Sequence, residues 1–217
     1  METLERIRSS GLLPVVEMPD AALARSLGEA LVDAGLPCAE ITFRTSVAAE
    51  AIAVLHRHCP ELLLGAGTVR TVEQAEEALG AGASFLVSPG FNHRVVDYAA
   101  EHDVVILPGV CTPTEIEMAV SRGLRVLKFF PAEAAGGIAF LKAVSGPYPE
   151  VRYVPTGGIG PSNLADYLAL PTVFACGGSW MVRKDLIAAG DFDAIRRLAA
   201  DAVALVRAAR PKEAAVS

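Results

Sequence analysis

The stretch Val126-Leu127-Lys128-Phe129-Phe130-Pro131-Ala132-Glu133 places one lysine in an apolar run that is typical of a buried strand. Burying a charged ammonium costs free energy, so such a lysine either acquires a charged partner or releases its proton. A neutral lysine is a nucleophile that can form a Schiff base with a carbonyl compound. The alternative is a lysine at a strand edge that keeps its head in water. The stretch alone favours neither interpretation.

Seven further runs of the same short, apolar character occur along the chain, and helical patterns separate them. The runs cover residues 12–16, 39–42, 62–65, 85–88, 104–108, 153–156 and 173–177, beside the first stretch at 126–130. The helical patterns cover residues 20–34, 46–58, 71–80, 92–101, 112–122, 138–144, 161–170 and 192–210. Short apolar runs that end at Gly, Pro or a polar residue are typical of strands buried on both faces.

Eight such runs alternating with helices predict an α/β protein, a (β/α)8 TIM barrel. An open doubly wound sheet is the structural alternative, and it is less favoured because no strand precedes a G-x-G-x-x-G turn. The chain has no linker or repeat, so we expect a single domain over residues 1–217. An extra N-terminal helix is expected over residues 1–10 and a frayed tail over 211–217.

The composition excludes several classes of function. The 217 residues are 52% hydrophobic and carry a net charge of −6, which argues against binding to nucleic acid or an anionic membrane. No apolar run approaches the ~20 residues of a membrane span, and the N-terminus lacks the apolar segment of a signal peptide. The four cysteines form no CxxC pair and no zinc spacing, so we expect reduced thiols in a cytoplasmic protein.

Catalytic groups of a barrel lie at the carboxyl ends of its strands. Glu40 lies in the second run, with Thr42 and Arg44 on the same alternation. Glu40 and Arg44 could form an ion pair that stabilises the barrel. With Lys128 in the same interior, the three residues instead favour a catalytic site. Glu40 would then be a general acid/base, and Arg44 would bind a substrate carboxylate through its planar fork.

Glycine turns follow the last two runs, as Thr156-Gly157-Gly158 and Gly177-Gly178-Ser179. Such turns either close the barrel or let backbone N–H groups reach a phosphate, and two of them at these strand ends favour the phosphate-binding interpretation.

Thr68, after Gly65-Ala66-Gly67, is either a helix cap or a substrate donor. No histidine and carboxylate stand at ligand spacing, so we expect no catalytic metal.

Two long motifs resemble one family, the 2-keto-3-deoxy-6-phosphogluconate (KDPG)/4-hydroxy-2-oxoglutarate (KHG) aldolases. Residues 35–45, GLPCAEITFRT, resemble its glutamate motif, and residues 123–136, which contain KFFPAE, resemble its Schiff-base lysine motif. Shorter matches are Gly65-Ala66-Gly67-Thr68-Val69, Ser88-Pro89-Gly90, Pro155-Thr156-Gly157-Gly158-Ile159 and Gly177-Gly178-Ser179-Trp180. The resemblance extends from about Gly11 to the last helix.

The resemblance implies a class I aldolase on a (β/α)8 barrel, a homotrimer that needs no metal or cofactor. It implies that Lys128 forms an imine with pyruvate, that Glu40 relays protons, and that Phe130 packs beside the imine. Arg44 and Thr68 would bind the pyruvate carboxylate. The remaining substrate contacts implied by the resemblance are Thr156 at the hydroxyl or carboxylate, and Gly157, Gly158, Gly178 and Ser179 at the phosphate.

The implied substrate is 2-dehydro-3-deoxy-6-phosphogluconate, cleaved to pyruvate and D-glyceraldehyde 3-phosphate, with 4-hydroxy-2-oxoglutarate as a second one, cleaved to pyruvate and glyoxylate. The chain departs from the family pattern at Phe43, at Ala135 and in the loop Cys111-Thr112-Pro113-Thr114. The loop change leaves an aldolase for the galactonate epimer open.

Two other functions on the same fold also remain at this point. One is a sugar-phosphate isomerase or epimerase with Glu40 as the enolising base and no imine. The other is a non-catalytic phosphoester-binding barrel, which is less favoured because binding alone requires no buried amine.

Overall fold

The computed structural model describes residues 2–210, and the tail expected to fray at 211–217 lies outside them. Within the described residues the strands are β1 Leu12–Val16, β2 Cys38–Thr42, β3 Leu63–Gly67, β4 Phe85–Val87, β5 Val105–Leu107, β6 Gly109–Val110, β7 Val126–Phe129, β8 Arg152–Pro155 and β9 Cys176–Gly178. The helices are α1 Glu2–Ser10, the 3-10 helix η1 Ala21–Leu23, α2 Ala24–Asp33, α3 Ala48–His58, α4 Val72–Gly80, α5 His93–Glu101, α6 Pro113–Val120, α7 Gly137–Ser145, α8 Leu164–Leu168, α9 Lys184–Ala189 and α10 Phe192–Ala209.

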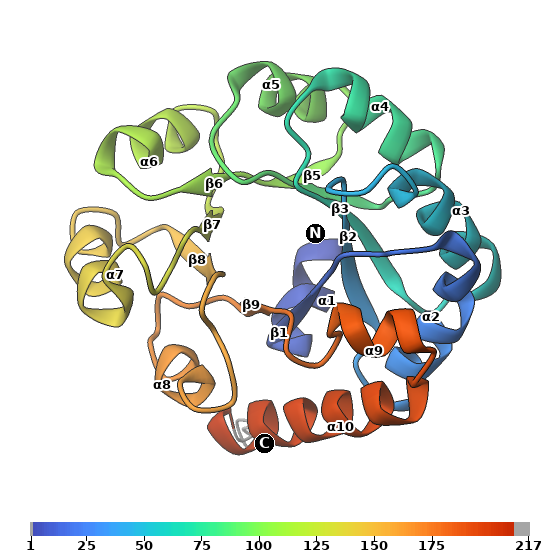
Figure 1. Cartoon of the computed structure of the whole chain (residues 1–217). Coiled ribbons are helices and arrows are strands. Elements are labelled where there is room, and N and C mark those ends of the chain that lie inside the picture. The colour runs from blue at the N-terminus through green and yellow to red at the C-terminus, as the bar shows by residue number, and fades with distance from the viewer. Residues whose placement is uncertain (1, 211–217) are drawn as a thin grey trace, which may run out of the picture.

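All strand pairs are parallel, and they form two sheets. The larger sheet has the order β5-β4-β3-β2-β1-β9, and the smaller has the order β6-β7-β8. The helices α2 to α10 surround the strands, while α1 lies at the centre of the view (Figure 1). The fold is therefore α/β, with a parallel sheet curled into a half-barrel, and the expected N-terminal helix is α1.

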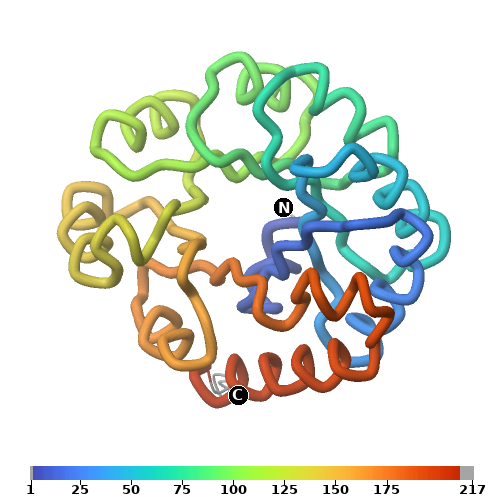
Figure 2. The backbone as a smooth tube through the Cα atoms, in the orientation of Figure 1, coloured from blue at the N-terminus to red at the C-terminus, as the bar shows by residue number. Residues whose placement is uncertain are grey.

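The chain passes once around the molecule (Figure 2), so that its last helix returns to its first elements. As a result α10 packs against α2 and α8. Every residue of β1, β2 and β3 is buried, which matches the absence of polar alternation in these runs. Among residues 2–210, no helix is both long enough and apolar enough to cross a bilayer.

Two predicted strands differ from the observed ones. The run at 104–108 corresponds to β5 alone, and the unpredicted strand β6 follows it after Pro108, which has no N–H to donate to a ladder. The run at 173–177 begins late: β9 starts at Cys176, and Val173 forms only an isolated bridge with Tyr153. Apolar character marked these segments as buried, but it did not show where the ladder was interrupted.

Helix starts followed capping chemistry only in part. Thr71, the first residue of the predicted helix 71–80, caps α4 by accepting a hydrogen bond from the backbone N–H of Gln74 at 3.2 Å. Ser46, the first residue of the predicted helix 46–58, does not cap α3, which begins after Val47 without a side-chain cap. The helix predicted at 161–170 is shorter in the structure, where α8 covers only Leu164–Leu168. Helix α9 was not predicted. Short helices such as these depend on tertiary packing more than on local propensity.

Candidate active site

Lys128 and Glu40 form a buried ion pair between strands that are far apart in the sequence. Lys128 lies on β7 and Glu40 on β2, 88 residues away, and the Lys128 Nζ is 3.1 Å from the Glu40 Oε1. The two residues are only 5% and 1% exposed. The lysine therefore has the charged partner that its burial requires. An edge lysine with its head in water is excluded.

The glycine at the end of β3 makes room for the Glu40 carboxylate. Glu40 pairs in register with Gly65, and Gly67 pairs with Thr42. A Cβ placed on Gly67 would lie 3.0 Å from the Glu40 Cδ and 3.1 Å from the Thr42 Cγ2. A side chain at position 67 would therefore press on the carboxylate that contacts Lys128. The G-A-G-T motif thus supports the site through its missing side chain.

The second carboxylate oxygen of Glu40 has no hydrogen-bond partner. Oε2 is buried, and nothing in the described chain donates to it. Buried polar atoms are almost always satisfied, and exceptions concentrate where a water, an ion or a substrate is needed. One carboxylate oxygen of Glu40 therefore accepts from Lys128, and the other is open to a donor from outside the described chain. The Phe130 ring adds a face to the site, with its centroid 5.5 Å from the Lys128 Nζ.

Arg44 is not part of this buried group, which corrects the sequence prediction. Strand β2 ends at Thr42, and residues 43–46 turn away, so the alternation that placed Arg44 beside Glu40 stops there. The Arg44 side chain is 45% exposed, and its Nη1 lies 4.0 Å from the Glu17 Oε2. The alternative interpretation, a Glu40–Arg44 ion pair, is therefore wrong. Arg44 lies at the carboxyl end of β2 with a different carboxylate partner.

Glu17 and Lys184 are charged residues that the sequence analysis missed. Glu17 follows the last residue of β1 and forms ion pairs with both Arg44 and Lys184. We call these three residues the rim cluster. Glu17 could have been identified, because it stands at the carboxyl end of a predicted strand. Lys184 carried no such signal, since α9, which it begins, was not predicted.

Thr68 follows β3 in a strained backbone conformation. Its φ is 58°, in the left-handed region that β-branched residues rarely adopt. It does not cap α4, since Thr71 does, so the helix-cap interpretation is wrong. Strain of this kind costs on the order of 1–3 kcal/mol and is concentrated at functional sites. Its position at the end of β3 keeps Thr68 as a candidate substrate donor.

The two glycine turns predicted to bind phosphate meet at one place. Thr156 and Gly177 form a parallel bridge, and a Cβ on Gly177 would lie 2.2 Å from the Thr156 Oγ1. Gly157 and Gly158 both have positive φ, +100° and +80°. The structure therefore places the turns side by side. It also explains why their contact position must be glycine.

The two ends of these turns differ in exposure. Thr156 is buried, and its hydroxyl donates to the Val154 carbonyl at 3.3 Å. Gly158 and Ser179 are exposed. The turns thus run from the interior to the surface at the carboxyl ends of β8 and β9. A Cβ on Gly178 would lie 2.0 Å from the Trp180 ring, so that indole packs directly on the second turn.

No candidate metal centre competes with this arrangement in the part of the chain that the structure describes. Within residues 2–210, no three His, Cys, Asp or Glu side chains come close enough together to hold an ion.

Comparisons with known proteins agree with the motifs. Residues 4–198 match the family model described as KDPG and KHG aldolase. The chain is 53% identical over 205 residues to the 2-dehydro-3-deoxy-phosphogluconate aldolase of Treponema pallidum, covering 94% of this chain and 96% of the relative. It is 42% identical over 200 residues to the KHG/KDPG aldolase of Escherichia coli K12, covering 92% of this chain and 94% of the relative.

A solved structure is similar over nearly the whole chain. It is KDPG aldolase from Legionella pneumophila with pyruvate captured at low pH as a covalent carbinolamine intermediate. The TM-score is 0.89 at 37% identity, and the alignment covers 93% of this chain and 98% of that one.

Proposed function

The chain belongs to the KDPG/KHG aldolase family, and we propose on this basis that Lys128 and Glu40 are its catalytic pair. The protein is a class I aldolase that cleaves 2-dehydro-3-deoxy-6-phosphogluconate to pyruvate and glyceraldehyde 3-phosphate. The relatives are named for phosphogluconate, and the Legionella structure holds pyruvate as a covalent carbinolamine. The proposed second substrate is 4-hydroxy-2-oxoglutarate, after the name of the E. coli relative.

The observation that carries the residue assignment is the buried Lys128–Glu40 pair. A carboxylate 3.1 Å from Nζ can accept the proton that must leave the ammonium before the amine becomes nucleophilic. Burial separates both groups from bulk water and strengthens their interaction. A lysine that served only structure would be expected to reach solvent.

The proposed reaction uses the pair at each proton transfer. The Lys128 amine adds to the C2 carbonyl, and loss of water from the carbinolamine leaves a protonated imine. The imine takes up the electron pair of the C3–C4 bond as that bond breaks, while Glu40 removes the C4 hydroxyl proton through a water. The aldehyde leaves, the enamine carbon is protonated, and hydrolysis returns the amine and pyruvate. The unpartnered Glu40 Oε2 supports this role, since it can accept the water's hydrogen bond.

We assign substrate positioning to the groups around the pair. Arg44 and Thr68 follow neighbouring strands and would bind the pyruvate carboxylate, with the Arg44 fork exchanging its distant Glu17 contact for it. Phe130 would pack against the imine. Thr156 would contact the hydroxyl or carboxylate. The phosphate would be bound at the joined turns by Gly157, Gly158, Gly178 and Ser179, where the exposed end of each turn suits an anionic group.

We also propose that the strands close into one complete (β/α)8 barrel that forms a single domain. Two bridges, Tyr153–Val173 and Thr156–Gly177, join β8 to the segment containing β9. Only Pro108 separates β5 from β6, and its carbonyl accepts from the Lys128 N–H at 3.0 Å. These contacts support closure with β5 and β6 counted as one strand.

A homotrimer in the cytoplasm is proposed as the working state. The trimer rests on the family resemblance, and the four free cysteines suit a reducing compartment. Sedimentation velocity on the purified protein measures the assembly. A monomer at micromolar concentration would contradict the trimer.

The test of the residue assignment is intact-mass spectrometry after incubation with pyruvate and sodium borohydride. We expect one stable pyruvyl adduct, mapped to Lys128 and absent from Lys128→Ala. Lys142→Ala, which removes an exposed lysine of α7, is the matched control and should retain the adduct. An adduct on another lysine would refute the assignment. No adduct on the wild type would instead favour an isomerase that forms no imine.

A further inference from the structure

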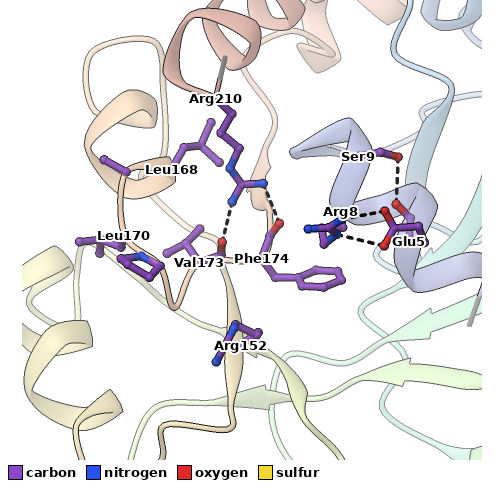
Figure 3. A pocket seen from close by; sticks show the side chains of 11 residues that line it. Glu5, Arg8, Ser9, Arg152, Leu168, Leu170, Val173, Phe174 and Arg210 are labelled. Carbon is purple, nitrogen blue, oxygen red and sulfur yellow. Dashed lines mark hydrogen bonds and ion pairs between the residues drawn. The ribbon is translucent and has the colours of Figure 1, made fainter. Parts of the chain in front are cut away.

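A cavity lies at the opposite end of the strands from Lys128 and Glu40. It has a volume of ≈ 630 Å³ and is lined by α1, by the first residue of β8, by residues 173–174 before β9, and by Arg210 after α10 (Figure 3). Arg152 begins β8, whereas Thr156 follows its last residue. A four-residue strand, about 10 Å long, therefore separates this cavity from the catalytic end.

The cavity concentrates positive charge on an acidic protein. Arg8, Arg152 and Arg210 line it, and among residues 2–210 Glu5 is the one acidic side chain in the lining. The chain as a whole has a net charge of −6. A local excess of two positive charges in a concave, partly desolvated place attracts anions more strongly than the overall charge suggests. We call this place the arginine cavity.

Backbone carbonyls hold two of the arginines in position. Arg210 donates from Nη1 to the Phe174 carbonyl at 3.0 Å and from Nη2 to the Val173 carbonyl at 2.5 Å. Arg152 donates from Nη1 to the carbonyls of Pro149, at 2.8 Å, and Val151, at 3.1 Å. Each guanidinium has five N–H donors, so these contacts leave donors for a ligand. The cations are thus oriented in advance.

The third arginine, Arg8, forms an ion pair with Glu5, with both distances 3.0 Å. Figure 3 shows Arg8, Arg152 and Arg210 on different sides of the cavity. Burial, and to a smaller extent the Arg8 guanidinium, lower the pKa of Arg210, so the like charges are close enough to repel. A bound anion would relieve this repulsion.

The rest of the lining is mainly apolar. Leu168 and Val173 are buried, and Leu170 and Phe174 are half-buried. Cations interspersed with apolar side chains suit a ligand that combines anionic groups with a flat or apolar body. The volume is within the range of pockets for small organic ligands.

We propose that the arginine cavity binds a small organic phosphate that carries two or more negative charges. Its phosphate oxygens accept from Arg8, Arg152 and Arg210, and its apolar body lies on Leu170 and Phe174. This site is separate from the phosphate turns of the catalytic end. The proposal concerns binding and holds whatever the identity of the aldolase substrate.

A purely structural role explains part of the cluster. Arg8 is in the last turn of α1 and Arg210 follows α10, where cations stabilise the negative end of a helix. Arg152 lies on a strand and has no such role. Helix stabilisation also does not account for the shared cavity.

The test is isothermal titration calorimetry on the full chain with ATP, tripolyphosphate and adenosine, without added metal. We expect ATP to bind, tripolyphosphate to bind less tightly and adenosine not to bind detectably. Arg8→Leu and Arg152→Met should each weaken ATP binding on the order of tenfold. Arg25→Leu is the matched control, because Arg25 is also 60% exposed and pairs with a glutamate on its own helix. It should bind ATP as the wild type does.

Ser179→Ala separates the two ends of the molecule and should leave ATP binding unchanged. Loss of binding in Ser179→Ala, or equal loss in Arg8→Leu and Arg25→Leu, would overturn the arginine cavity as the site. So would no binding of ATP to the wild type at millimolar concentration. Equal affinities for ATP and tripolyphosphate would show that the apolar body of the ligand contributes nothing to binding, which would contradict an organic phosphate as the ligand. If Arg152→Met fails to fold, Arg8→Leu, with its exposed side chain, decides the outcome.

Discussion

Two groups of charged residues toward the carboxyl ends of the strands are similar in composition but differ in their exposure to solvent. Lys128 and Glu40 lie 3.1 Å apart and are almost fully buried. In the rim cluster, Glu17 serves both Arg44 and Lys184, whose side chains are 45% and 59% exposed. Lys128 and Glu40 are shielded from bulk water, so each depends on the other for stabilisation of its charge. The rim cluster remains solvated.

The difference shows which ion pairs can control chemistry. When a proton moves between two buried groups, the electrostatic free energy of the site changes strongly, because little solvent is present to screen the charges. Around the rim cluster, water and salt screen the charges, so the residues can exchange partners at little cost. This contrast supports the proposal that imine chemistry takes place at the buried pair and that the rim cluster binds substrate anions reversibly.

The largest expected effect is on turnover at the buried pair. Lys128→Met removes the nucleophile, and we expect cleavage of 2-dehydro-3-deoxy-6-phosphogluconate to fall on the order of 10⁴-fold or more. A coupled assay of pyruvate release measures it. Lys184→Met, which removes an exposed lysine of the rim cluster, is the control. A Lys128→Met variant that retained a tenth of the wild-type rate would exclude the imine mechanism.

The next effect is on stability. Lys128→Met leaves a buried carboxyl without its partner, and we expect a loss of roughly 3–5 kcal/mol in the free energy of unfolding. In Lys128→Met/Glu40→Gln the unpaired charge is gone, so the double variant should recover much of that loss. Urea denaturation of the two single variants and the double variant completes the cycle. Strictly additive losses would show that the two side chains do not interact in solution.

The proposed role of Arg44 predicts an effect on substrate binding. Arg44→Ala should raise KM for unphosphorylated 4-hydroxy-2-oxoglutarate roughly tenfold to a hundredfold, because a charged hydrogen-bond donor to its carboxylate is lost. Lys184→Ala removes the other partner of Glu17 and should change this KM little. Arg44→Lys should restore binding in part, since it keeps the charge and loses the fork. If both alanine variants raised KM equally, Arg44 would act only through Glu17.

The phosphate turns predict a smaller and selective effect. Ser179→Ala should raise KM for the phosphorylated substrate about tenfold and leave KM for 4-hydroxy-2-oxoglutarate within about twofold. Parallel steady-state kinetics on the two substrates measure this difference. Ser121→Ala, at an exposed serine after α6, is the control for loss of a hydroxyl elsewhere. Equal increases for both substrates would contradict a phosphate site at Ser179.

The smallest effect is expected on the stability of the rim cluster. Glu17→Gln should change the free energy of unfolding by less than about 1 kcal/mol, and added salt should reduce the change further. Thermal unfolding at low and high ionic strength tests it. A loss as large as that of Lys128→Met would show that the rim cluster is more desolvated than its exposure indicates.

Local sequence patterns identified most of the elements and two key residues. Apolar runs located β1, β2 and β7 to within a residue or so, because burial on both faces leaves a direct mark on composition. The same rule marked Lys128 and Glu40 as charges in buried strands. Composition gave no comparable signal for the short helices, for the break between β5 and β6 at Pro108 or for the late start of β9. The sequence therefore did not predict these features correctly.

The partners of the charged residues followed only from tertiary structure. The chain itself identified Lys128 as a lysine in need of a partner, but register and strand order assigned it Glu40, 88 residues away. Arg44 left the interior because a strand ended two residues earlier. The arginine cavity collects residues from Glu5 to Arg210. Burial is a property of local pattern, whereas pairing depends on distances between segments that no local pattern encodes.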